Sequence, residues 1–342
     1  SAGQQQSFVN HLFIPFKEHS LKLRHTLLRK LTGENIHRKE LQKRCDRMMS
    51  PSLHEFDPEF IWVEFGTTAV VGRSLLLRLN KPYFIAVHGY DITTEFRDEQ
   101  YKNQFVEVSN HPNSIGVICA SEYTKRLCIL AGVNPEKCRV IRLSLDSERI
   151  KPLAEIQKTE EPSFVHFGRL TEKKHPIATL EAFRLVLKDL PSASLTYIGD
   201  GPLSDELRNR IEDAGLSKNV RMLGAMDREA ALKEVQRHWD FCQHSVTAKS
   251  GDQEGFALSP AEAALLEMPV VSTIHNGIPE HVLDGKTGYL VPEFDFVRMA
   301  ERMVELAEDS ELRNRFGKAG RKNVEVICSG ETRKRELSNL FG

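Results

Sequence analysis

The feature that most constrains this chain is a repeated alternation of short apolar runs with amphipathic stretches of helical spacing. The apolar runs lie at 60–65, 83–87, 114–120, 139–143, 164–167, 195–198, 220–223, 241–246, 270–273 and 289–291. Helical patterns fall between them, for example at 69–79, 123–130 and 176–188. In the last of these, one stripe holds five apolar residues: Ile177, Leu180, Phe183, Val186 and Leu187. Short strands alternating with helices are typical of a parallel sheet covered on both faces, so we expect an α/β fold.

Residues 151–162 divide this alternation into two halves. They are polar, lack periodicity and carry a proline near each end, which indicates a linker. We therefore expect two Rossmann-like, doubly wound parallel sheets, in residues 1–150 and 163–320. A helical tail over 321–342 is expected to cross back to the first domain. Doubly wound sheets bind ligands at the carboxyl ends of their strands, so the expected site is the cleft between the two sheets.

Charge and cysteine content narrow the functional class. The chain has 47 basic and 48 acidic residues, and a net charge of −1 argues against a dedicated nucleic-acid binder. No apolar run approaches the roughly 18 residues of a membrane-spanning helix. The six cysteines include no C-x-x-C pair, so we expect reduced thiols in a cytoplasmic protein. The chain begins with Ser and shows no signal-peptide pattern, which leaves open whether native residues precede it.

Two glycine turns follow predicted strands of the second half. The first, GRLTEKK at 168–174, places Arg169 and Lys174 five residues apart, where two cations can bracket one anion. The second is GDGP at 199–202. Taken alone, the first turn is also typical of a solvated loop and the second of an ordinary strand-to-helix turn.

The most informative motif is EGFALSPAE at 254–262. We expect Ser259 to be a helix N-cap, with Pro260 and Glu262 at the first and third helical positions, as in a capping box. The start of such a helix offers backbone N–H groups and the positive end of the macrodipole, which suits a phosphate. Glu254 lies too far upstream to cap this helix. An acid beside an anion site needs a cation or hydroxyl partner, and this marks Glu254 as functional.

Together these motifs resemble those of the retaining GT-B glycosyltransferases of family 4. EGFALSPAEA is similar to the family's E-x7-E signature, with Glu254 and Glu262 as the two acids. VHFGRLTEKK resembles its VGRLxxEK segment, YIGDGPL its GDGP turn, and MPVVSTIHNGIPEHVLDGKTGYLVP its PVV…GGxxE…GxLV stretch. HGYD at 88–91 resembles its HGxD loop. The ordered set spans roughly residues 60–320 and is far more specific than any one motif.

The resemblance implies an acceptor side in the first domain and a nucleotide-sugar site in the second. It implies four catalytic residues: Arg169 and Lys174 as a diphosphate clamp, Glu254 on the donor sugar, and His88 facing the transferred sugar from the other domain. Alone, His88 is typical of an ordinary loop histidine. Glu262 is implied to hold the ribose hydroxyls. The remaining implied donor contacts are Gly168, Gly199 and Gly201 in the turns, Gly224, Ala225 and Met226 beside the base, and Gly255, Phe256, Ala257 and Leu258 at the diphosphate.

The expected chemistry follows from the charge that develops on the departing diphosphate. Fixed cations and a helix N-terminus stabilise that charge without a metal, and the absence of any D-x-D argues against the metal-dependent GT-A type. The resemblance further implies retention of the anomeric configuration. We therefore expect a retaining hexosyltransferase with no cofactor, using a UDP-sugar donor and a glycan or polyprenyl-linked acceptor in polysaccharide biosynthesis. A GDP-mannose donor and a non-catalytic sugar-nucleotide-binding protein of the same fold stay open. Residues 1–120 contain no G-x-G-x-x-G, which argues against a nicotinamide-dependent dehydrogenase.

Residues 16–50 hold ten Lys or Arg against four acids, which indicates either a solvated helix face or contact with an anionic membrane surface or a polyprenyl-diphosphate-linked acceptor. The chain departs from the family pattern at two places. Residues 1–35 lack the glycine-rich loop that usually follows the first strand. RLSLD at 142–146 replaces the usual PNGVD. Either the first strand element is trimmed or remodelled, or acceptor binding differs from the family pattern. The replacement at 142–146 predicts a different geometry at the interdomain junction.

Overall fold

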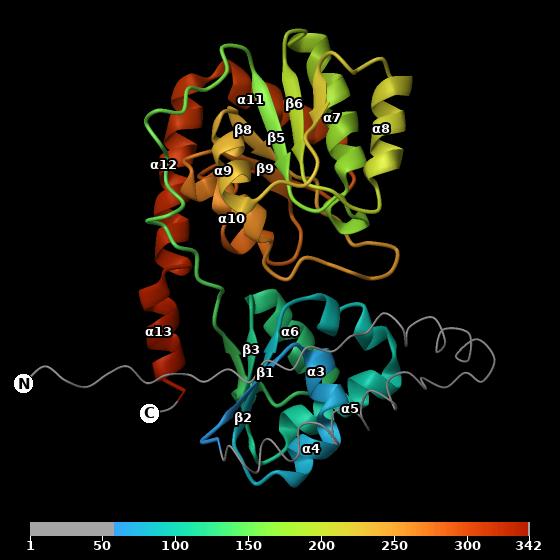
Figure 1. Cartoon of the computed structure of the whole chain (residues 1–342), viewed down its shortest axis with the longest axis vertical. Coiled ribbons are helices and arrows are strands. Elements are labelled where there is room, and N and C mark those ends of the chain that lie inside the picture. The colour runs from blue at the N-terminus through green and yellow to red at the C-terminus, as the bar shows by residue number, and fades with distance from the viewer. Residues whose placement is uncertain (1–57, 341–342) are drawn as a thin grey trace, which may run out of the picture.

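The computed structural model describes residues 58–340, which form two parallel sheets in two lobes (Figure 1). The N-terminal lobe has four described strands in sequential order, so each new strand adds to the same edge. They are β1 (Ile61–Glu64), β2 (Tyr83–Val87), β3 (Ser114–Cys119) and β4 (Cys138–Val140). The helices of this lobe are α3 (Gly66–Val71), α4 (Arg73–Arg78), η1 (Tyr90–Ile92), η2 (Glu95–Arg97), α5 (Glu99–Asn110), α6 (Glu122–Ala131) and η3 (Pro135–Lys137).

The C-terminal lobe has a six-stranded parallel sheet in the order β10-β9-β8-β5-β6-β7. Its strands are β5 (Ser163–Phe167), β6 (Ser194–Ile198), β7 (Val220–Met222), β8 (Asp240–Cys242), β9 (Val270–Thr273) and β10 (Gly288–Val291). Its helices are η4 (Glu172–Lys174), α7 (Pro176–Asp189), α8 (Ser204–Asp213), α9 (Arg228–Gln236), α10 (Leu258–Leu265), η5 (Ile278–Glu280) and α11 (Phe296–Glu308). The strand order reverses between β5 and β8, and ligands bind beside such a switch point. The loops after these two strands carry the glycine turn at 168–174 and the EGFALSPAE motif.

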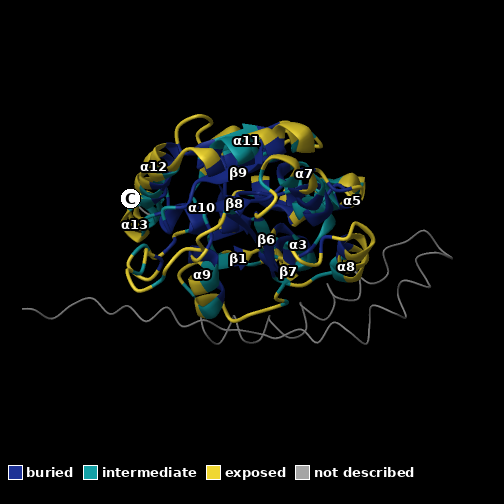
Figure 2. Cartoon of the chain, turned by 90° about the horizontal axis from the view of Figure 1, so that it is seen from above, coloured by how far each residue is buried: buried dark blue, intermediate teal, exposed yellow. Residues whose placement is uncertain are grey.

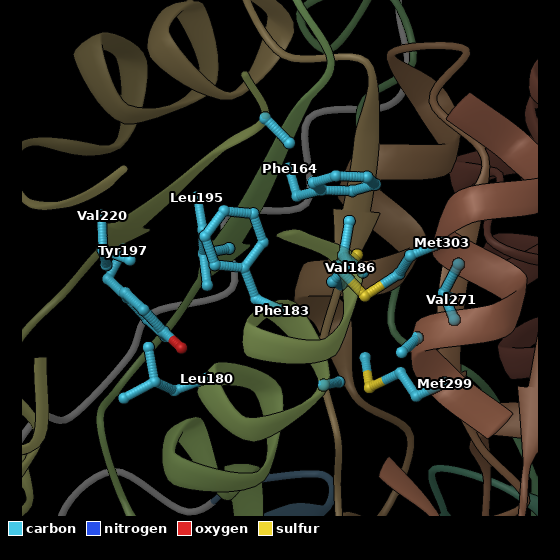
Figure 3. Close-up of a cluster of buried hydrophobic side chains, with 14 of the residues drawn as sticks. Phe164, Leu180, Phe183, Val186, Leu195, Tyr197, Val220, Val271, Met299 and Met303 are labelled. Carbon is cyan, nitrogen blue, oxygen red and sulfur yellow. The ribbon is translucent and has the colours of Figure 1, made fainter. Parts of the chain in front are cut away.

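Side chains packed on the six-stranded sheet form the largest core of the molecule (Figure 3). Phe164 of β5 meets Phe183 of α7 edge to face, with ring centroids 6.1 Å apart. Such a pair adds about 0.5–1.5 kcal/mol beyond the area it buries. Seen from above, β8 and β9 lie in the buried interior, while the outer faces of α8 and α12 are exposed (Figure 2). The predicted apolar stripe on α7 is confirmed. Four of its residues are buried in this core, namely Ile177, Leu180, Phe183 and Val186, and Leu187 packs against it partly buried.

Three predicted elements differ in the structure. The strand expected over 139–143 ends at Val140. The helix expected over 69–79 is interrupted at Gly72, between α3 and α4, because glycine loses most backbone freedom in a helix. The strand expected over 241–246 ends at Cys242. Beyond it, hydroxyl groups of β9 bind the backbone carbonyls of Gln243 and Ser245, at 2.7 and 2.5 Å, in place of a continued ladder. This early end releases the chain into the loop that carries Glu254.

The C-terminal helices connect the two lobes. α12 (Ser310–Ile327) belongs to the C-terminal lobe, and α13 (Gly330–Ser338) lies beside the N-terminal sheet (Figure 1). Leu337 and Leu340 pack against a small core that includes Phe84 and Ile118. The chain therefore returns to the first lobe, although α12 continues through residue 320, where the tail was expected to begin.

Three further observations concern predictions about compartment and membrane. Within residues 58–340, no helix has both the length and the apolar character needed to cross a membrane. The described cysteines are free thiols and all are buried: Cys119, Cys128, Cys138, Cys242 and Cys328. The basic stretch at 16–50 and the region expected to hold a glycine-rich loop lie outside the described residues.

Candidate active site

The start of α10 differs from the capping box that the sequence predicts. The helix begins at Leu258, its N-cap is Ala257 with φ +61°, and no side chain caps it. Ser259 and Glu262 lie inside the helix and are buried. The prediction of Ser259 as N-cap was wrong because the left-handed turn at Ala257 starts the helix two residues earlier than a serine cap would. Without a side-chain cap, the first-turn N–H groups are available to an anion.

Lys174 and Glu254 form a buried ion pair beside this helix. Lys174 Nζ lies 2.9 Å from Glu254 Oε1 and 3.4 Å from the side-chain oxygen of Gln243. Only 12% of the Lys174 side chain and 9% of the Glu254 side chain are exposed. Burial by itself raises the pKa of Glu254, but the ammonium groups of Lys174 and Lys173 outweigh it and the pKa falls below its ordinary value. Glu254 is therefore anionic, and it has the cation partner that an acid beside an anion site requires.

The second predicted cation, Arg169, is exposed, and its guanidinium makes no ion pair or hydrogen bond with the residues at 58–340. Gly168 precedes it with φ +145°. A Cβ at Gly168 would lie 3.2 Å from both Lys174 Cε and Ser259 Oγ. The turn after β5 thus passes against α10, which leaves Arg169 outside, where it can reach an incoming anion.

A buried histidine that the sequence reasoning missed holds the Glu254 backbone. The Glu254 N–H donates to His275 Nε2 at 3.2 Å. His275 Nδ1 lies 2.6 Å from the carboxylate of Glu293. Because Nε2 accepts, the proton sits on Nδ1 and is donated to Glu293. The segment STIHNG carries His275, but its pattern gave no sign that the ring reaches Glu254.

The two lobes meet at the Glu254 loop. Ser121 Oγ at the start of α6 donates to the Gly255 carbonyl at 2.7 Å, and Tyr123 Oη donates to Gln253 at 2.5 Å. A Cβ on Gly255 would lie only 1.8 Å from the His88 carbonyl oxygen, so this position requires glycine. The His88 backbone therefore lies against Gly255, the residue after Glu254, whereas the role of the His88 imidazole toward the transferred sugar stays a prediction.

Asp91, the acid of the HGYD loop, organises the N-terminal side of the site. It is buried, and its carboxylate accepts hydrogen bonds from the N–H groups of Gly66 at 2.8 Å, His88 at 3.1 Å and Gly89 at 2.9 Å. These bonds tie the turn after β1 to the turn after β2. The His88 imidazole in turn contacts the carboxylate of Glu64, the last residue of β1.

Glu262 is held by Arg228, the first residue of α9, which the sequence reasoning also missed. Arg228 Nε and Nη2 lie 2.9 and 2.5 Å from Glu262 Oε1. Burial raises the pKa of Glu262, and the guanidinium offsets this only in part. The turn expected beside the base consists of Gly224, Ala225 and Met226 and ends just before α9. Arg228 therefore connects that turn to Glu262, the acid expected at the ribose.

Gly199 and Gly201 allow two loops to pack closely. A Cβ at Gly199 would lie 2.0 Å from the Gly168 carbonyl oxygen, and one at Gly201 would lie 2.5 Å from that of Leu170. Both glycines are therefore explained by packing against the turn after β5, and their contact with a donor stays a prediction. The same holds for the donor-binding roles of Phe256, Ala257 and Leu258, which lie at the start of α10.

Within residues 58–340, no group of three or more His, Cys, Asp or Glu side chains is arranged to hold a metal ion. Of the charged residues predicted for the site, Glu254 is paired with Lys174, and Glu262 is paired with Arg228.

Comparison with known proteins identifies the family. The sequence model described as glycosyl transferases group 1 matches residues 149–323, slightly more than half of the chain. The amylovoran biosynthesis glycosyltransferase AmsK of Erwinia amylovora is 27% identical over 292 residues, which cover 84% of this chain and 70% of that protein. The putative colanic acid biosynthesis glycosyltransferase WcaL of Salmonella typhimurium is 30% identical over 277 residues, covering 81% and 68%.

Solved structures agree on the architecture. Anabaena HepE in complex with UDP superposes with a TM-score of 0.76 at 20% identity, covering 85% of this chain and 80% of that one. Sucrose-phosphate synthase from Thermosynechococcus elongatus gives a TM-score of 0.75 at 18% identity, covering 89% and 78%. The predicted GT-B fold, two Rossmann-like domains, is confirmed. On the matched motifs and the relatives together, the chain is a glycosyltransferase that belongs to the group 1 family.

Proposed function

We propose that this glycosyltransferase retains the anomeric configuration, works without a metal or other cofactor, and moves a hexose from a UDP-sugar to a glycan or lipid-linked acceptor in polysaccharide biosynthesis. The observation that carries the proposal is the buried Lys174–Glu254 pair beside the uncapped start of α10. The relatives named for amylovoran and colanic acid biosynthesis support the pathway class. Anabaena HepE, crystallised with UDP and with UDP-glucose, supports the donor.

The charges explain how the donor bond would break. The bond between the anomeric carbon and the diphosphate oxygen breaks, and the diphosphate gains negative charge. Arg169, Lys174 and the first-turn N–H groups of α10 stabilise that charge. The acceptor oxygen bonds to the same face of the anomeric carbon, and its proton passes to the departing diphosphate. Glu254, which is anionic, then accepts hydrogen bonds from hydroxyls of the sugar.

A GDP-mannose donor is the second candidate. A GDP-mannose-dependent phosphatidylinositol mannoside mannosyltransferase of Corynebacterium glutamicum is 30% identical over 175 residues, covering 51% of this chain and 45% of that protein. The turn at 224–226 favours neither base, because two of its residues have small or no side chains and Met226 is partly exposed.

Calorimetric titration with UDP, GDP, UDP-glucose and GDP-mannose tests the donor. We expect binding of UDP and the UDP-sugar that is unchanged by EDTA, and loss of binding in Arg169→Ala. Lys218→Ala, on an exposed loop of the same lobe, is the matched control. Binding of GDP alone would favour the mannose donor, and binding without sugar transfer would favour a non-catalytic protein. The anomeric configuration of the transferred sugar, read by NMR, decides retention.

The membrane contact is a separate part of the proposal. We propose that the protein works in the cytoplasm and meets the inner membrane face through residues 16–50, whose basic excess would attract anionic lipid. Co-sedimentation with vesicles containing phosphatidylglycerol, at low and high salt, tests it. Salt-sensitive binding supports the contact, and absence of binding at low salt contradicts it.

A further inference from the structure

The Glu64 carboxylate joins two aromatic rings at the carboxyl end of β1. The Trp62 indole N–H donates to Glu64 Oε2 at 2.6 Å. His88 Nε2, at the end of the neighbouring strand β2, makes a short contact with Glu64 Oε1. Each carboxylate oxygen therefore has its own partner, and the side chain is fixed although 51% of it is exposed.

These contacts determine which nitrogen of His88 carries the proton. The hydrogen bond from His88, more than any other cause, holds the pKa of Glu64 below its ordinary value, so this carboxylate is ionised and can only accept. Nε2 must then be the protonated nitrogen. Nδ1 makes no hydrogen bond with the residues at 58–340, and in the neutral ring it is an acceptor.

The imidazole is also held in place from other directions. The Phe65 ring lies 4.8 Å from it, and Phe65 adopts φ +70°, which directs the chain out of β1 toward the histidine. Asp91 accepts from the His88 backbone N–H. The His88 carbonyl lies against Gly255, the residue after Glu254. The ring therefore has a fixed orientation beside the loop that carries the buried acid of the donor site.

We propose that Glu64 is the positioning residue for His88, because it binds the Nε2 proton and leaves Nδ1 as an acceptor for a hydroxyl group of a bound sugar. The proposal rests on the proposed function, since it requires a sugar at this place in the cleft. It assigns to the N-terminal lobe a carboxylate–imidazole pair that recognises substrate hydroxyls, opposite the cations of the C-terminal lobe.

Glu64→Gln gives a specific test, because an amide has only one acceptor. Trp62 can only donate, so the glutamine oxygen is expected to face Trp62 and the amide N–H₂ to face His88. Nε2 must then accept, and the ring proton moves to Nδ1. Substrate hydroxyls would meet a donor where the wild type has an acceptor, while the overall shape of the site is kept.

Long-range ¹H–¹⁵N correlation on protein labelled with ¹⁵N-histidine measures the tautomer directly, with His88→Gln to assign the signal. At about pH 8, above the ordinary titration range of histidine, we expect the Nε2–H form in the wild type and the Nδ1–H form in Glu64→Gln. In Trp62→Phe/Glu64→Gln the amide oxygen is released to face His88, so the Nε2–H form should return. A wild type in the Nδ1–H form, or a tautomer unchanged by Glu64→Gln, would overturn the proposal.

Turnover supplies the second readout. We expect Glu64→Gln to lower kcat about 10- to 100-fold, the range for removing the outer hydrogen-bond partner of a metal-bound histidine. The KM for the donor should stay within about twofold, and the double variant should recover part of the loss. Glu107→Gln, which removes a similarly exposed carboxylate paired with Arg73, should change neither kcat nor the tautomer. A changed tautomer with unchanged kcat would overturn the role in the reaction. Failure of the proposed function is seen separately, as a wild type that binds no nucleotide sugar in calorimetry.

Discussion

The N-terminal lobe buries Asp91 among three backbone N–H donors, whereas the C-terminal lobe buries Asp240 without a hydrogen bond and Glu254 against Lys174. In the first case the carboxylate organises two turns of the chain. In the C-terminal lobe, the charge of Glu254 is matched by Lys174, whereas the Asp240 carboxylate has no direct hydrogen-bond partner. Asp91 therefore shapes backbone in the N-terminal lobe, whereas the Lys174–Glu254 pair of the C-terminal lobe places charge beside the start of α10, where an anion would bind.

This difference corresponds to the expected division of work. A departing diphosphate is stabilised by cations whose positions do not change during the reaction, and the pair with Glu254 fixes Lys174 in this way. A bound sugar needs hydrogen-bonding groups of defined polarity, which the proposed Glu64–His88 pair would supply.

Lys174→Ala should have the largest effect, because it removes a diphosphate cation and leaves Glu254 buried without its partner. We expect turnover to fall about 10²- to 10³-fold, from lost charge stabilisation. The free energy of unfolding should fall by about 3–5 kcal/mol, from the uncompensated buried charge. Steady-state kinetics and urea unfolding measure the two effects.

The double variant Lys174→Ala/Glu254→Gln separates these effects. It removes both charges, so stability should largely return while turnover stays low. Recovery of turnover in the double variant would show that Lys174 acts only by neutralising Glu254, and the diphosphate clamp would then be wrong.

Aspartate-to-asparagine substitution should change stability with opposite sign in the two lobes. Burial raises the pKa of Asp240 from 3.8 to about 7, against the lowering influence of Arg313 and Lys158. Asp240→Asn should therefore stabilise the protein above pH 7 by up to about 4 kcal/mol, at 1.36 kcal/mol per pKa unit. Asp91→Asn should destabilise it by about 1–3 kcal/mol, because an amide nitrogen cannot accept the backbone bonds.

The pH dependence of the Asp240 effect has a defined direction. Between about pH 4 and pH 7 the folded protein holds a proton at Asp240 that the unfolded chain releases, so wild-type stability falls as pH rises through this window and levels off above it. The free energy of unfolding of Asp240→Asn should not show this fall between about pH 4 and pH 7, and urea unfolding at several pH values measures it. Exposed Asp213→Asn is the control. Equal slopes in Asp240→Asn and the wild type would contradict the assignment.

Much of this site was predictable from sequence because strand ends, glycine turns and the E-x7-E spacing are local patterns. Those patterns located Lys174 and Glu254 on neighbouring loops, and the β5–β8 switch point brings them together. The start of α10 was mispredicted because the positive φ of Ala257 depends on packing and not on residue type. His275 and Arg228 were missed because their partners lie 21 and 34 residues away, and no local spacing encodes such contacts.

Arg228→Gln should have the smallest effect. It tests whether the role of Glu262 depends on its ion pair with Arg228. Without the guanidinium, burial should raise the pKa of Glu262 further, so a larger fraction is protonated as pH falls. A protonated carboxyl is a weaker acceptor for ribose hydroxyls, and we expect UDP affinity to fall about tenfold, the loss for one hydrogen bond to a charged group.

The loss should be greater at about pH 6 than at about pH 8, since a carboxyl whose pKa is raised becomes more protonated as pH falls. Arg210→Gln, which breaks an exposed pair on α8, is the control. Equal affinity losses at both pH values in calorimetry would mean that Arg228 contacts the nucleotide itself, and the charge pairing at Glu262 would then not explain its role.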